Sequence, residues 1–282
     1  MPVRNALRPT LGALLSLLWA TATLAAERPG AFLGDLSWPE AEIRLRSAPV
    51  VIVPFGAGAK EHGPHLPLAT DRLVLEHLLR AAAAQLNVVV APEILHGWFP
   101  AFREFPGTDI DDPDLFGRYA LAVARSLVRH GAQRVVFLNT GISRSSGLPL
   151  AIAARELHTQ QHVPALLVSW DDLETPELRQ LLQQRAGSHA DELETSIVLA
   201  LRPDLVHMER AVDEEPHPES TPAGGYQPQD LSRHAGDPDY SASGVVGSPR
   251  LASPEKGRRA LALMTERWLS ILQRFATTPA AR

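Results

Sequence analysis

The chain contains no cysteine, few aromatic residues and no excess of positive charge. Of its 282 residues 6% are aromatic, and the formal net charge is −5 at pH 7. Without cysteine there are no disulfides and no thiolate ligands, so stability must come from the core, and a metal site would need histidine and carboxylate side chains. The acidic balance and the lack of a basic stripe argue against nucleic acid as a partner. A full glycine-rich dinucleotide pattern is also missing.

The remaining composition is that of a globular domain preceded by an export signal. The chain is 45% hydrophobic and 21% charged, which is ample material for a core. Residues 1–26 carry charge only at Arg4 and Arg8, followed by an apolar run from Leu11 to Ala20 that is short for a membrane span. We therefore expect a signal peptide at 1–26 and one domain at 27–282, exported to the periplasm or secreted without stable membrane association. The alternative is an uncleaved membrane anchor.

Short apolar runs alternate with helical patterns along the domain. Buried strands are predicted at 50–55, 88–91, 134–139 and 165–170, and helices at 71–84, from 113 to about 130, at 150–157, from about 188 to 201 with Ser188 as its N-cap, and from 254 onwards. Strands separated by helices pair in parallel through right-handed crossovers, so we expect an α/β fold with a mostly parallel sheet. Residues 212–247, rich in Pro, Gly and polar residues, predict an irregular excursion.

Polar residues are concentrated in the loop that follows the first buried strand. This loop reads GAGAKEHGPHLPLATD and contains Lys60, Glu61, His62 and Asp71. Open parallel sheets bind their ligands at the carboxyl ends of strands, so the loop is expected to form the site. The spacing alone leaves two interpretations open, a metal centre and a satisfied hydrogen-bond network.

Other loops at strand ends are candidates for the walls of the same site. The aromatic, proline-bearing loop at 96–109 fits a pocket wall, where Trp98 and Phe102 either stack on a planar substrate or anchor the loop. A second loop of small residues at 139–147 follows the strand at 134–139.

The block HGPHLPLATD at 62–71 resembles the creatininase (creatinine amidohydrolase) family. The stretches FPGT at 105–108, HADELETS at 189–196, LSWPE at 36–40 and the run at 247–257 are similar to further motifs of that family. This resemblance covers most of the domain. It implies a three-layer α/β/α fold, a homo-oligomer that is often a hexamer, and a divalent-metal site, zinc or manganese, that hydrolyses cyclic amides and related C–N bonds of a small-molecule substrate.

Carried over by position, the resemblance assigns a role to each residue of the site. It makes His62, Asp71 and Glu194 metal ligands, with Asp71 bridging two metals in the family, and it places His189 beside them as a proton-transfer group. Glu61 is a second candidate for proton transfer, or a surface carboxylate next to the motif. His65 is expected to brace the loop rather than to bind the metal.

Two positions depart from the family pattern. Lys60 stands where the family usually has glutamate, and Gly141 stands where it usually has histidine. In the family both missing ligands bind the same metal of the pair. We therefore expect one ion per chain rather than two, with the Lys60 ammonium near the place of the second metal, keeping Asp71 ionised. Lys60 acting as a base or as an oxyanion partner is the alternative.

The leading interpretation is an exported, metal-dependent amidohydrolase acting on a cyclic amide or a related small amide, with His189, Lys60 and Glu61 in catalytic roles. An alternative from another class is a non-catalytic binding protein that kept the fold and the pocket. A third interpretation, a metal-free hydrolase with Ser143 or Ser145 as nucleophile, lacks a nucleophile-elbow pattern.

Overall fold

The computed structural model describes residues 29–141, 145–214, 231–237 and 240–279. The predicted signal peptide and Ser143 lie outside these residues. The strands are β1 (Ala31–Phe32), β2 (Val50–Phe55), β3 (Val88–Val90), β4 (Val135–Asn139) and β5 (Ala165–Ser169). The α-helices are α1 (Trp38–Ser47), α2 (Thr70–Gln85), α3 (Pro113–Arg129), α4 (Gly147–Gln161), α5 (Trp170–Leu173), α6 (Pro176–Gln180), α7 (Glu192–Leu201) and α8 (Pro254–Ala276).

The strands form one parallel five-stranded sheet in the order β1-β3-β2-β4-β5. The central pair is β2 and β4, in which Phe55 at the end of β2 lies opposite Asn139 at the end of β4. The loops that follow these two strands therefore start side by side at the carboxyl edge of the sheet. In an open parallel sheet this edge is the usual place for a ligand site.

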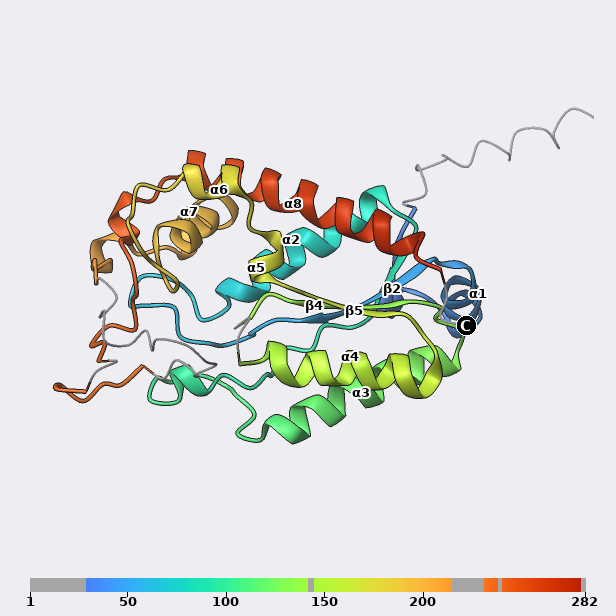
Figure 1. Ribbon diagram of the computed structural model, residues 1–282. Coiled ribbons are helices and arrows are strands. Elements are labelled where there is room, and N and C mark those ends of the chain that lie inside the picture. The colour runs from blue at the N-terminus through green and yellow to red at the C-terminus, as the bar shows by residue number, and fades with distance from the viewer. Residues whose placement is uncertain (1–28, 142–144, 215–230, 238–239, 280–282) are drawn as a thin grey trace, which may run out of the picture.

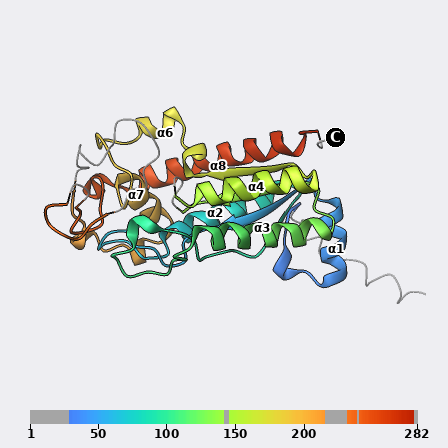
Figure 2. The same ribbon diagram turned by 60° about the horizontal axis from the view of Figure 1, so that its bottom comes forward.

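Helices cover both faces of the sheet, which gives three layers. In Figure 1, α2, α7 and α8 lie on one face, and α3 and α4 lie on the other; Figure 2 shows α3 and α4 running next to each other. Successive strand residues point to opposite faces, as pleating requires. Ile52 packs in the core shared with α2, α7 and α8, whereas Val51 and Val53 pack with α3 and α4. The predicted three-layer α/β/α fold is confirmed.

Polar side chains fix the starts of several helices. The Asp112 carboxylate accepts hydrogen bonds from the backbone N–H groups of Asp114 and Leu115 at the start of α3, and the Ser253 hydroxyl accepts one from Lys256 N–H at the start of α8. These caps satisfy backbone donors that have no partner inside the helix.

The edge strand β1 was not predicted from the sequence, and two element ends differ from the expectation. The helix expected to begin at Ser188 begins at Glu192, and its N-cap is Asp191, whose carboxylate accepts from two N–H groups of the first turn. Trp170, expected at the end of a strand, instead begins α5. Both errors concern element ends, where neighbouring polar residues compete for one capping position.

Outside the cores, the described parts of the excursion at 212–247 form isolated β-bridges rather than helices or longer strands. Val246 pairs with His189, and Gly247 pairs with Glu214. Of the helices that the structure describes, none has both the length and the apolar character needed to cross a bilayer.

Candidate metal centre

The predicted site residues come together at the carboxyl edge of the sheet. The loop after β2 supplies Lys60, Glu61 and His62, and the first turn of α2 supplies Asp71. The segment leading into α7 supplies His189, and the first turn of α7 supplies Glu194. Each of these side chains is buried, with residue exposures from 0% for His62 to 9% for Glu194. Sequence reasoning therefore named one connected cluster.

Asp71 is held between a cation and an imidazole. Its Oδ2 lies 2.9 Å from Lys60 Nζ, and its Oδ1 lies 3.0 Å from His62 Nε2. The other ring nitrogen of His62 lies 2.9 Å from the carbonyl oxygen of Lys60, which fixes the plane of the ring. The backbone of Asp71 is held as well, because the Thr140 hydroxyl in the loop after β4 donates to its carbonyl at 2.9 Å.

His189 is held by two carboxylates. Its Nε2 lies 2.9 Å from Oε2 of Glu61, and its Nδ1 lies 3.8 Å from Oε2 of Glu194. Glu194 also accepts a hydrogen bond of 2.5 Å from the N–H of Ala190. Ala190 has φ of +48°, a left-handed conformation that costs about 1 kcal/mol or more for a residue with a Cβ. The backbone beside His189 is thus strained, and Glu194 helps to hold it.

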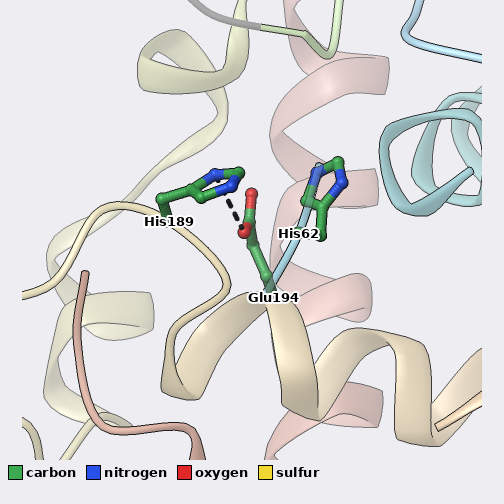
Figure 3. A group of neighbouring side chains, drawn as sticks. All are labelled: His62, His189 and Glu194. Atoms are coloured by element: carbon green, nitrogen blue, oxygen red, sulfur yellow. Dashed lines mark ion pairs between the residues drawn. The ribbon is translucent and has the colours of Figure 1, made fainter. Parts of the chain in front are cut away.

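Figure 3 shows Glu194 rising from the first turn of α7 between the rings of His189 and His62. Potential ligand atoms of these three residues all lie within 4.8 Å of one another. This group contains two of the predicted ligands, together with His189, for which proton transfer was predicted. Asp71, the third predicted ligand, adjoins the group through its contact with His62.

The donor set fits a zinc or manganese ion. Imidazole and carboxylate are ligands that both metals accept. The 3.0 Å between His62 Nε2 and Asp71 Oδ1 would have to lengthen only to about 3.4 Å for both atoms to be ligands of one tetrahedral zinc with bonds of about 2.1 Å.

Burial and charge act on the site's pKa values in opposite directions. Burial works to raise the pKa of Asp71, but the Lys60 ammonium and the His62 imidazole outweigh it and hold that pKa well below its usual range. Burial works to lower the pKa of His62, yet the Asp71 carboxylate outweighs it and raises this pKa overall. For Glu61 the contacts with His189 outweigh burial and lower the pKa. The protein's own groups therefore keep Asp71 and Glu61 ionised.

Three carboxylates and one ammonium lie among these buried groups. Asp71 faces the ammonium of Lys60, whereas Glu61 and Glu194 face the imidazole of His189. At the neighbouring N-cap, burial and the charge of Glu194 raise the pKa of Asp191 to about 7. A divalent cation would neutralise the surplus, and this is a second respect in which the site fits a metal ion.

Space beside Gly141, the position of the missing histidine, is tight. A Cβ at Gly141 would lie 3.2 Å from the ring of Phe99, and Phe99 is 4% exposed. A side chain at this position would need the ring to shift by a few tenths of an ångström. Of the loop after β4, residues 142–144 lie outside the described part of the chain.

Several contacts of the site were not predicted from the sequence. The Phe102 ring lies 4.1 Å from the ring of His189 between centroids, and no local pattern specifies this. His65 Nε2 lies 2.8 Å from the Thr195 hydroxyl of α7, an example of the bracing expected for His65. Gly244, with φ of +78°, packs on Glu61, and a Cβ there would overlap the Glu61 carboxylate.

The chain resembles known proteins over most of its length. It matches the family model described as "Creatininase: Creatinine amidohydrolase" over residues 34–272. It is 32% identical to the creatinine amidohydrolase of Pseudomonas putida over 82% of this chain and 91% of that protein. It is 28% identical to the 3-dehydro-scyllo-inosose hydrolase of Thermotoga maritima over 83% of this chain and 80% of that protein.

Solved structures give the same result. The structure named "Creatininase Mn" superimposes with a TM-score of 0.72 at 28% identity, covering 88% of this chain and 99% of that one. A mutant creatininase of Zn-Zn type gives 0.72 at 28% identity, covering 88% and 98%. The fold and the enzyme class expected from the motifs, a metal-dependent amidohydrolase, are confirmed. The two named relatives carry different substrates in their names, so similarity alone leaves the substrate open.

Proposed function

Because the chain belongs to the creatininase family, we propose that it hydrolyses a C–N bond of a cyclic amide or a related small amide with one divalent ion, zinc or manganese, per chain. In this proposal His62, Asp71 and Glu194 hold the ion. His189, Glu61 and Lys60 have catalytic roles and do not bind the ion.

The contact between Lys60 and Asp71 carries the proposal of a single ion. An ammonium lies 2.9 Å from Asp71 Oδ2, on the carboxylate that bridges two metals in the family pattern. The Lys60 ammonium takes the place of a second metal ion, because either one balances the charge of the Asp71 carboxylate. Gly141 supports the same conclusion, since it has no side chain to serve as the missing ligand and the Phe99 ring lies close beside it.

The roles of the residues follow from their contacts. When bound, the ion supplies Lewis-acid polarisation of a substrate carbonyl and an acidified water. Lys60 keeps Asp71 ionised, so Asp71 remains a ligand. Glu61 orients His189 through the contact of 2.9 Å, and His189 delivers a proton to the leaving nitrogen.

Metal content per chain tests the proposal. Protein purified without chelators should contain about one zinc or manganese ion per chain, because only one set of ligands is complete. His62→Ala should lose the ion, and His234→Ala, which removes a histidine whose side chain is 79% exposed, should keep it. Near two ions per chain would contradict the role of Lys60. Cyclic amides should then be screened with chelated and reconstituted protein.

A non-catalytic binding protein is the second candidate. The replacements at Lys60 and Gly141 favour it, because they remove ligands that the family pattern uses. Protein that takes up no metal after reconstitution, and that binds a small amide without turning it over, would support this candidate instead.

We further infer export and self-association. The charge and hydropathy pattern of residues 1–26 supports a cleaved signal, and N-terminal sequencing of protein from the periplasmic fraction tests it.

An apolar surface on α3 and α4 supports self-association. It contains four side chains that are about half exposed, Leu115, Tyr119, Leu148 and Ile152. Such a surface supports a homo-oligomer, which by resemblance is a hexamer. Light scattering on Tyr119→Glu, which should have a lower mass, tests that.

A further inference from the structure

We propose that the turn formed by residues 100–106 is a gate over the site, with the Phe102 ring as its plug and the segment 231–234 as its latch. In the structure the gate is closed. Substrate reaches His189 and Lys60 after the turn moves outward. This inference rests on the proposed function, because it concerns access to the same site.

The Phe102 ring covers the two groups that a substrate must reach. Its centroid lies 4.1 Å from that of the His189 ring and 5.1 Å from Lys60 Nζ. Rings at 4.1 Å are in van der Waals contact, so no substrate atom fits between them. The cavity that remains beside Lys60, lined also by Glu61, Phe99 and Phe105, has a volume of about 20 Å³, room for about one water molecule.

One polar atom of His189 is already paired. Nε2 contacts Glu61 at 2.9 Å, whereas Nδ1 lies 3.8 Å from Glu194, beyond hydrogen-bond distance. A planar small molecule needs a few hundred Å³, far more than the cavity beside Lys60 offers. Entry therefore requires a displacement of the covering side chain.

The turn has fixed ends, as a hinged segment requires. On one side Phe99 is buried at 4% exposure, and the carbonyl of Trp98 accepts a hydrogen bond of 2.7 Å from the Ser146 hydroxyl. On the other side the Thr108 N–H donates to the carbonyl of Ala59 at 2.8 Å. Between these anchors the chain is a short 3-10 turn whose outer residues are exposed, so a rotation about its ends breaks few contacts.

A second segment holds the turn down. Leu231 N–H donates to the carbonyl of Ala101 at 2.9 Å, and Arg233 N–H donates to the Glu104 carboxylate at 2.7 Å. The Arg233 guanidinium also lies 5.4 Å from the centre of the Phe105 ring. These contacts join the turn to a segment more than a hundred residues away in sequence, and they break together when the gate opens.

Residues 244 and 246 of the same excursion contact the site residues beneath the gate. Gly244 packs on Glu61, and Val246 exchanges backbone hydrogen bonds with His189. The excursion thus contacts both the outside of the gate and the groups that the gate covers. When the gate is closed, these contacts hold Glu61 and His189 in place and water is excluded from both side chains.

Chemical labelling of His189 tests the gate without metal or substrate. The full chain, kept in chelator, is treated with diethyl pyrocarbonate, and acylation of His189 is followed by peptide mass spectrometry against the exposed His130. Phe102→Ala should raise the rate of His189 labelling about tenfold, because the ring no longer covers it. Glu104→Ala should raise it at least about threefold, because a charged hydrogen bond of the latch is lost. Arg103→Ala, on the same turn but paired outward with Asp111, should leave it unchanged.

Hydrogen exchange supplies a second readout. The Leu231 amide, protected by its bond to Ala101, should exchange faster in Glu104→Ala and at the wild-type rate in Arg103→Ala. Equal His189 labelling in wild type and Phe102→Ala, both folded by circular dichroism, would overturn the gate. Neither readout needs catalysis, so the gate and the proposed hydrolase activity can fail separately.

Discussion

The ammonium of Lys60 and the carboxylate of Asp71 lie 2.9 Å apart, and both side chains are almost fully buried. Lys60 thus places a positive charge beside a carboxylate of the candidate metal site. Removing the cation leaves the buried carboxylate with the His62 imidazole as its remaining partner, and a bound ion would neutralise it more fully. Stability and metal binding are therefore linked at Asp71.

Lys60→Met removes this cation while keeping most of the side-chain volume. In metal-free protein the free energy of unfolding should fall by about 3–5 kcal/mol, the usual loss when one partner of a buried ion pair is removed. Zinc should restore part of the loss because it neutralises Asp71 in the folded state. Urea unfolding with chelator and with zinc measures both effects.

Lys256→Met is the matched control. Lys256 contacts Glu192, which is 0% exposed, at the start of α7. Its replacement should also destabilise the protein, but zinc should not reverse the loss because this pair lies outside the donor group. An identical zinc response in both variants, or no response in Lys60→Met, would contradict the linkage.

His189→Ala separates proton transfer from metal ligation. If His189 moves a proton, the variant keeps about one ion per chain and loses activity by about 10²–10⁴-fold. Elemental analysis and kinetics on one preparation measure both. Loss of the ion together with activity would place His189 among the ligands, in the group that the geometry forms with His62 and Glu194.

His65 should make stability depend on pH below neutrality. Burial lowers its pKa in the folded protein from 6.5 to about 4. Between these values the unfolded chain binds a proton that the folded protein does not, so stability falls as pH falls. The free energy of unfolding should drop by about 2 kcal/mol from pH 7 to pH 5 through this group. His65→Gln, which retains a partner for Thr195, should flatten that part of the pH profile; an unchanged slope would refute the assignment.

Gly257 should tolerate no side chain. A Cβ there would overlap the carbonyl of Ser196, where α8 crosses α7. Gly257→Ala should destabilise the protein by about 3 kcal/mol, because backbone must move to make room. Gly34→Ala, at a position with nothing within 4 Å of the added Cβ, should be close to neutral. Thermal unfolding compares the two, and a small effect at both positions would show that the helices separate easily.

Much of the fold could be predicted from local patterns. The apolar runs at 50–55 and 134–139 predicted β2 and β4 because a strand buried on both faces needs apolar residues at consecutive positions. The N-cap of α7 is Asp191 rather than the predicted Ser188. Both residues can cap a helix and both lie near its start, so the sequence alone does not show which one does. The motif positions also named His62, Asp71, His189 and Glu194 before any geometry was known, and Glu61 was a candidate from its place beside the motif.

The sequence by itself determined which groups are present: histidine and carboxylates without cysteine, a lysine in place of one usual ligand and a glycine in place of another. Only the tertiary structure decided which groups meet. Glu61 reaches His189 across 128 positions of the chain, and Phe102 covers that same ring. Helices and strands follow from hydrogen bonds and periodicity among near neighbours, whereas these contacts depend on how separate loops pack at one edge of the sheet.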